Sequence, residues 1–132
     1  MRRFAIATLL CCAVGAQADT RLVERGLQAF ERRGADAAVD VWMDGSMLQL
    51  AGVFDQIRAQ LGRFSQLCGS LETWETLEST NYGSRVTEQI LVLNFRRCPV
   101  FARFNTYTRD GDEVLTRFNL NASYDKLLAT GD

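Results

Sequence analysis

The amino-acid sequence predicts an α+β fold, with N-terminal helices packed on a curved, cone-shaped, four-stranded antiparallel sheet. Apolar residues recur at helical spacing through the first half of the chain. After residue 70 the pattern changes to runs of strand-forming residues separated by turn residues. Because no helix is predicted between these strands, we expect a meander with the helices covering one face.

The first 18 residues have the three parts of a cleavable secretory signal. Met1-Arg2-Arg3 is positively charged, residues 4–15 form an uncharged apolar run, and Ala16-Gln17-Ala18 supplies the small residues of a cleavage site. The apolar run is shorter than the roughly 20 residues of a spanning helix. We therefore predict a signal peptide over residues 1–18, and a secreted or periplasmic protein without a membrane span after cleavage.

Cleavage would leave residues 19–132 as a single domain, which is long enough to bury a core. A lipid anchor at Cys11 or Cys12 is disfavoured, because no small residue directly precedes this pair. Loss of Arg2 and Arg3 leaves 13 basic and 16 acidic residues, a net charge of −3. These charges are dispersed, without the basic cluster that neutralises phosphates, so we expect no nucleic-acid partner.

Three helical segments are predicted before residue 70. The first covers residues 20–33, and the second, residues 37–43, is capped by Asp36 and ends at the turn Asp44-Gly45-Ser46. The third covers residues 48–67. Its apolar residues follow a 4-3-4-3 spacing along one face: Leu50, Phe54, Ile57, Leu61 and Phe64.

Four strands are predicted after residue 70. They cover residues 71–81, 85–96, 100–108 and 114–120. The second strand is apolar on both faces at its centre, as in a strand buried on both sides, and Asp110-Gly111 favours a tight hairpin turn. In the last strand, one face is predicted to carry Val114, Thr116, Phe118 and Leu120. Residues 121–132 are predicted to form a short terminal helix or tail.

Two cysteines, Cys68 and Cys98, remain after signal cleavage, and an oxidising compartment favours a disulfide between them. A hairpin that turns around Gly83 pairs residues whose numbers add up to 166, which is also the sum for these cysteines. Closing a loop of about 30 residues stabilises a fold by roughly 3 kcal/mol. A redox-active pair is the less favoured alternative, because the spacing is not Cys-x-x-Cys.

At several positions the chain resembles a known protein family. They are Ala29-Phe30, Gly34-Ala35-Asp36, Ala38, Trp42, Phe54, Ile57, Leu61-Gly62 and the strand 114–120. On these positions the chain resembles the nuclear transport factor-like superfamily, also called SnoaL-like or cystatin-like cone folds, and in particular its small secreted members of unknown function. The resemblance implies a cone between helix and sheet that often binds a small apolar molecule. Some members are isomerases, cyclases or dehydratases, and some are dimers through the outer sheet face.

The candidate ligand-binding residues fall on the second helix, the turn that follows it and the third strand. They are Trp42, Asp40, Asp44, Arg103, Asn105 and Tyr107. An arginine inside a sheet among aromatic residues can meet a carboxylate-bearing ligand, although an exposed outer face or a dimer contact explains the same pattern. For the two aspartates, a solvated surface charge is the favoured explanation. No cofactor or metal is expected, since the chain has no histidine and too few cysteines for a zinc site.

The missing histidine also removes Ser-His-Asp triads and Cys-His dyads, so no catalytic residue is assigned. We favour an exported, non-catalytic domain that binds a small, partly apolar ligand in the cone or docks to an envelope protein. The first alternative is an isomerase- or dehydratase-like enzyme with a buried carboxylate from Asp40, Asp44 or Glu75 as base. The second is a structural homodimer through the sheet.

Overall fold

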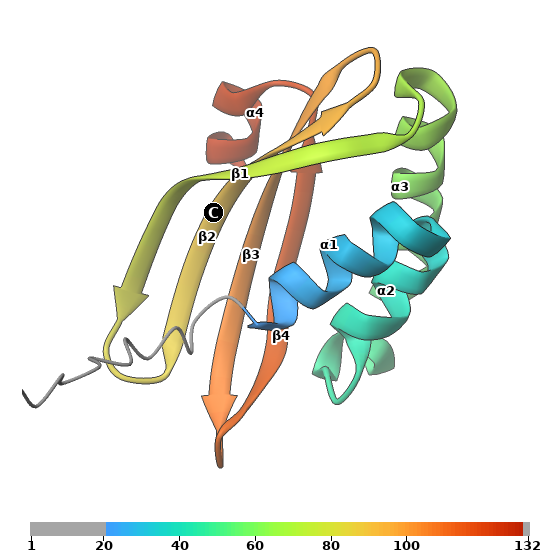
Figure 1. The fold of residues 1–132 in the computed structure, drawn as a ribbon. Helices are drawn as coiled ribbons and strands as arrows, with labels where there is room; N and C mark the ends of the chain where they lie inside the picture. The colour runs from blue at the N-terminus through green and yellow to red at the C-terminus, as the bar shows by residue number, and fades with distance from the viewer. Residues whose placement is uncertain (1–20, 131–132) are drawn as a thin grey trace, which may run out of the picture.

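The computed structural model describes residues 21–130 and has the α+β architecture that the sequence predicts (Figure 1). The predicted signal peptide lies outside the described residues. The helical elements are α1 (Arg21–Arg33), α2 (Ala35–Met43), the 3-10 helix η1 (Met47–Ala51), α3 (Val53–Cys68) and α4 (Tyr124–Ala129). The strands are β1 (Leu71–Tyr82), β2 (Val86–Phe95), β3 (Pro99–Arg109) and β4 (Asp112–Asn121).

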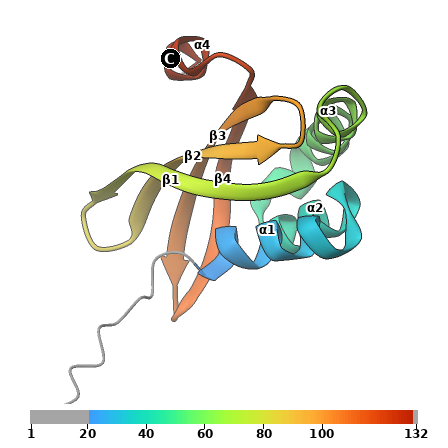
Figure 2. The same cartoon turned by 45° about the horizontal axis from the view of Figure 1, so that its top comes forward.

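The four strands form one open antiparallel sheet in the order β1-β2-β3-β4, which confirms the predicted meander. Helices α1, α2 and α3 gather on one side of the sheet (Figures 1 and 2). Alternate residues of β3, Ala102 and Phe104, are fully buried toward these helices. Phe101 points to the opposite face, where its ring meets Tyr124 of α4 at 5.5 Å between centroids. Helix α4 therefore packs on the face that the other helices leave uncovered.

The core between the helices and the sheet is organised around Trp42. Its side chain is fully buried, and its indole lies 5.0 Å from Phe104 and 5.3 Å from Phe118 between ring centroids. The indole Nε1 donates a hydrogen bond to the Val23 carbonyl oxygen at 3.2 Å. This bond satisfies the one polar atom of the ring and joins α2 to α1.

Two details of the helical region differ from the prediction. Asp36 does not cap α2; it lies in the first turn, and the N-cap is Gly34 at φ 92°, a conformation that glycine adopts without a steric penalty. The predicted continuous helix over residues 48–67 is divided at Gly52, which has φ 69° and separates η1 from α3. Helical spacing alone did not reveal this break, because the apolar period continues across it.

Strand β1 contains two bulges, so the predicted hairpin register holds only at the open end of the hairpin. Near the turn, Tyr82 faces Val86, so opposed residue numbers there add up to 168 instead of 166. Register shifts at Glu72 and Leu77 insert one extra β1 residue each, and such bulges bend a strand and increase its twist. Beyond both shifts Leu71 faces Phe95, so the sum has fallen to 166 at the open end of the hairpin.

The predicted disulfide is present between Cys68 at the end of α3 and Cys98 just before β3. The two Cα atoms are 5.2 Å apart, within the ordinary range for a disulfide. The bond ties the last turn of the long helix to the turn between β2 and β3. It therefore fixes the helical layer to the sheet at one end.

A third bulge overturns the predicted face of β4. The register shifts opposite Asn105 and Thr106 and leaves Thr116 as the extra residue. Leu115 is fully buried with Phe118, whereas Thr116 is exposed and donates a hydrogen bond to the Asn105 carbonyl oxygen at 3.1 Å. A regular two-residue alternation cannot place these side chains, because the bulge changes the face after Leu115.

Within residues 21–130, no helix combines the length and the apolar character that crossing a bilayer requires.

Candidate functional site

A small pocket of about 230 Å³ lies between α1 and the first two strands. Helix α1 supplies Val23, Glu24 and Leu27, strand β1 supplies Trp74 and Thr76, and strand β2 supplies Gln89 and Leu91. Thr76 and Leu91 face each other in the β1–β2 register, so the floor of the pocket is a cross-strand pair. Four of the lining side chains are apolar, and three are polar: Glu24, Thr76 and Gln89.

Gln89 is the unusual residue of this pocket. Its side chain is 2 % exposed, and its Oε1 is buried without a hydrogen-bond partner among the described residues. A buried acceptor without a donor costs roughly 1–3 kcal/mol, and native structures contain few of them. A ligand or a water molecule that donates to Oε1 would remove this cost. Gln89 is therefore the polar group around which a ligand would be oriented.

The local shape of the pocket depends on the second bulge of β1. The extra residue, Leu77, follows directly after Thr76 at the pocket edge, and its side chain is 47 % exposed. Bulges often occur beside binding sites, where they redirect neighbouring side chains. Trp74, on the same strand, is half-buried and forms one wall. Trp74 of this edge strand therefore forms an aromatic wall of the pocket, together with residues of α1.

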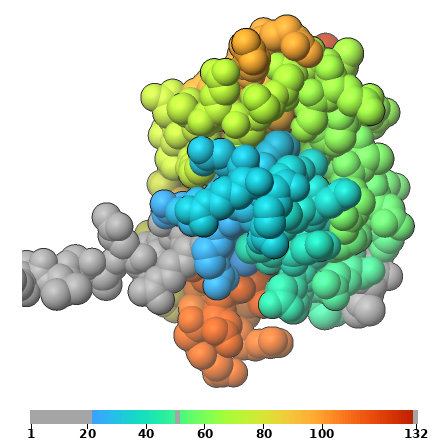
Figure 3. Space-filling view, turned by 45° about the vertical axis from the view of Figure 1, so that its right-hand side comes forward, coloured from blue at the N-terminus to red at the C-terminus, as the bar shows by residue number. Residues whose placement is uncertain are grey.

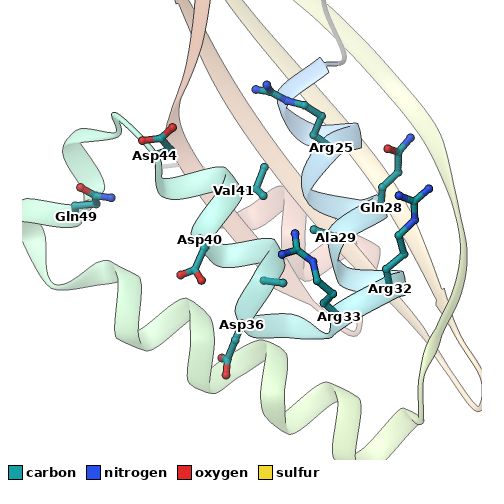
Figure 4. A pocket seen from close by; sticks show the side chains of 11 residues that line it. Arg25, Gln28, Ala29, Arg32, Arg33, Asp36, Asp40, Val41, Asp44 and Gln49 are labelled. Atoms are coloured by element: carbon teal, nitrogen blue, oxygen red, sulfur yellow. The ribbon is translucent and has the colours of Figure 1, made fainter.

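The structure places the six candidate residues in three separate locations. Trp42 lies in the hydrophobic core. Asp40 is exposed on α2 and Asp44 directly after its end, and both line an open surface cleft of about 1100 Å³ between α1 and α2 (Figure 4). Figure 3 shows the side of the molecule where these two helices form the surface. The remaining three candidates lie on β3.

Asp40 has a structural contact that explains its position. Its carboxylate accepts a hydrogen bond from Arg58 of α3 at 2.9 Å, and Asp36 forms a second ion pair with the same guanidinium at 2.9 Å. Hydrogen bonds to Asp40 and then Asp36 raise the pKa of Arg58. Arg58 also lies 4.6 Å above the Phe54 ring. These contacts connect α2 to α3 and do not enclose a ligand site.

Arg103, Asn105 and Tyr107 share one face of β3, as their spacing predicts, and that face is opposite to the core. Arg103 is 5 % exposed, and the other two are half-buried. Tyr107 faces Val114 across the β3–β4 hairpin, in the predicted register. Its hydroxyl accepts a hydrogen bond from Arg85 at 3.1 Å, and this bond raises the pKa of Arg85.

The three carboxylates on which the enzyme alternative depends are all exposed. Asp40 and Asp44 lie at the surface of α2, and Glu75 lies on an exposed position of β1. None of them is the buried carboxylate whose pKa burial would raise into the range of a general base. Over the described part of the chain, no group of three or more acidic or cysteine side chains is placed to hold a metal ion.

Comparisons with protein-family models, with curated proteins and with solved structures give no match for this chain.

The pocket was not predicted from the sequence, because its buried polar residue, Gln89, lies within an apolar strand. Gln89 stands next to Ile90 at the start of the buried stretch of β2. That position was a usable signal, since an amide inside a strand buried on both faces needs a partner. The approach of α1 over β1 and β2, which forms the walls, depends on tertiary packing and has no local signature.

Proposed function

We propose that this chain is an exported domain that binds a small, partly apolar molecule in the pocket between α1, β1 and β2. The observation that carries the proposal is the buried Oε1 of Gln89, which has no hydrogen-bond partner among the described residues and lies in a partly apolar pocket. A fitting ligand has one N–H or O–H group for Gln89 and a compact apolar body for Leu27, Trp74 and Leu91. The volume, about 230 Å³, is below the roughly 300 Å³ at which drug-sized sites begin.

Export is the second part of the proposal. It is supported by the signal-like pattern of residues 1–18 and by the Cys68–Cys98 disulfide, a bond typical of oxidising compartments. Expression of the full chain in a bacterium, followed by N-terminal sequencing of the periplasmic fraction, tests it. We expect a mature chain that begins at Asp19. An intact N-terminus in the cytoplasmic fraction would contradict this part.

Membership of the nuclear transport factor-like superfamily stays a proposal as well. It is supported by the arrangement of three helices on one face of an antiparallel meander and by a pocket between the first helix and the sheet. The ligand proposal does not depend on this relationship, because it rests on the residues that line the pocket.

Phenol and toluene form a matched probe pair for the pocket, because they differ mainly by one hydroxyl donor. We expect the mature protein to prefer phenol by about fivefold, since a net hydrogen bond contributes roughly 1 kcal/mol. Trp74 fluorescence and NMR titration report binding at the pocket wall. In Gln89→Leu the preference for phenol should disappear, and toluene should bind at least as well as before.

Gln56→Leu is the control, because Gln56 is exposed on α3 and does not line this pocket. This control variant should keep the phenol preference. A second readout separates a binding role of Gln89 from a structural one. If Oε1 has no partner in the unliganded protein, Gln89→Leu should unfold at the same or a higher urea concentration. Equal binding of the two probes to the unsubstituted protein would contradict the proposal.

A further inference from the structure

The face of the sheet opposite the core carries a second polar group that its own fold does not satisfy. Arg103 is 5 % exposed, and its Nε is buried without a hydrogen bond among the residues that the structure describes. The nearest acidic group is Glu88 on β2, whose Oε2 lies 3.9 Å from that Nε. A structural buried arginine is normally hydrogen-bonded as well as paired, because burying a charge is costly.

The neighbours of Arg103 divide into satisfied and unsatisfied groups. Arg117 donates to the Asn119 side chain and to the Thr130 carbonyl oxygen, so its guanidinium is engaged. Tyr124 donates to Glu78. Asn105 lies two residues after Arg103 on the same face, and its Oδ1 is buried without a partner in residues 21–130.

Strand register brings the unsatisfied groups together. Asn105 faces Glu88 directly, and Arg103 faces Ile90, the next outward-facing residue of β2. One guanidinium therefore lies beside one carboxylate and one amide oxygen on a single patch of sheet. The patch is bordered by the half-buried ring of Phe101, which also meets α4. We call Glu88, Arg103 and Asn105 the outer-face triad.

We propose that the outer-face triad binds a free α-amino acid with an apolar or aromatic side chain. The planar guanidinium of Arg103 matches the ligand carboxylate with two parallel hydrogen bonds. Glu88 and the Asn105 Oδ1 are acceptors for the ligand ammonium group, which has three donors and no acceptor capacity. The ligand side chain would pack beside the half-buried ring of Phe101.

Charge complementarity favours this ligand class over a simple anion. A carboxylate alone would satisfy Arg103 but would leave the Asn105 oxygen without a donor and would lie close to Glu88. A phosphate dianion would be repelled by Glu88 and would need more than one guanidinium. A zwitterion instead replaces the long Arg103–Glu88 contact with close contacts to both residues. The triad is reached from the surface, since the Glu88 side chain keeps 19 % exposure.

Ligand analogues test the proposal without altering the protein. Phenylalanine carries both charges, its N-acetyl derivative lacks the ammonium, and its amide lacks the carboxylate. By NMR titration of the mature protein we expect phenylalanine to bind about 10- to 100-fold more tightly than either derivative, as charged hydrogen bonds contribute roughly 1.5–3 kcal/mol. These three compounds also distinguish a free amino acid from a peptide terminus, which carries only one of the two charges.

Variants then assign each charge to a residue. Arg103→Met should abolish phenylalanine binding, whereas Arg109→Met, an exposed arginine at the end of the same strand, should leave it unchanged. Glu88→Gln should weaken phenylalanine about tenfold and leave N-acetylphenylalanine unchanged or tighter, because a competing carboxylate is removed. Absence of phenylalanine binding, equal binding of all three compounds, or unchanged binding to Arg103→Met would each overturn the proposal.

The site lies on the opposite face of the sheet from the Gln89 pocket, so the two proposals succeed or fail separately. Gln89→Leu should leave phenylalanine binding unchanged.

Discussion

Substitution of Gly26 by alanine is the sharpest test of the core packing described above. Gly26 lies buried in the middle of α1, directly against the Trp42 indole of α2. A Cβ atom at this position would stand 1.9 Å from Nε1 and 2.3 Å from Cε2 of that indole. Real side chains do not approach so closely, so the helices must separate or the indole must move.

The expected cost follows from three terms. Alanine in a helix interior gains about 1 kcal/mol over glycine. Overpacking costs roughly 1–3 kcal/mol, and the loss of the Trp42–Val23 hydrogen bond leaves a buried N–H without a partner, at roughly 1–3 kcal/mol. Using the midpoints, Gly26→Ala should lower the free energy of unfolding by about 3 kcal/mol, or roughly 12 °C in Tm for a domain of this size.

Gly62→Ala is the matched control, since Gly62 lies inside α3 and an added Cβ meets nothing within 4 Å. That variant should be more stable by up to about 1 kcal/mol. Urea unfolding of the oxidised protein, followed by circular dichroism, measures both. A Gly26→Ala protein that is as stable as the unsubstituted one would refute the close packing of α1 on Trp42.

Three further outcomes are expected. Replacing Cys68 and Cys98 together by serine should lower the free energy of unfolding by about 3 kcal/mol, measured by urea unfolding; an unchanged midpoint would contradict a stabilising bond. Ser46→Ala should cost roughly 1–3 kcal/mol in the same assay, because the buried hydroxyl donates to a β4 carbonyl oxygen and accepts from the first turn of η1. The hydrogen bond from Tyr124 to Glu78 raises the pKa of Tyr124. The stabilisation from this hydrogen bond is therefore fully present below the pKa of tyrosine in the unfolded chain, about 10. It is lost as the pH rises through the pKa of Tyr124 in the folded protein. Absorbance titration of tyrosinate should show Glu78→Gln titrating at lower pH, and an unchanged curve would exclude the bond.

The element order was predictable because each element has a local cause. The heptad-like spacing of α3 and the Asp110-Gly111 turn act over a few residues, and the structure confirms both. The register of β1 was not predictable, since no local sequence signal marked the bulges at Glu72 and Leu77. These bulges change the sum of opposed residue numbers to 166 at the end of the hairpin where the cysteines pair.

The candidate sites were predictable only in part. Spacing on β3 grouped Arg103, Asn105 and Tyr107 correctly on one face, because side chains alternate along a strand. It did not reveal Glu88, which joins them through the β2–β3 pairing. Trp42 was predicted to line the ligand site, whereas it is fully buried, and this burial depends on how α1 packs against it.

The two bulges of β1 also bear on how the domain behaves at high concentration. Strand β1 is 12 residues long, forms an edge of the sheet, and exposes nearly all its side chains. A straight edge of this length would present a continuous row of N–H and C=O groups to another molecule. The bulges at Glu72 and Leu77 interrupt that row, and Glu75 and Glu78 place like charges along it. The irregularity that brings the hairpin into register near the disulfide therefore also makes this edge a poorer template for strand pairing between copies.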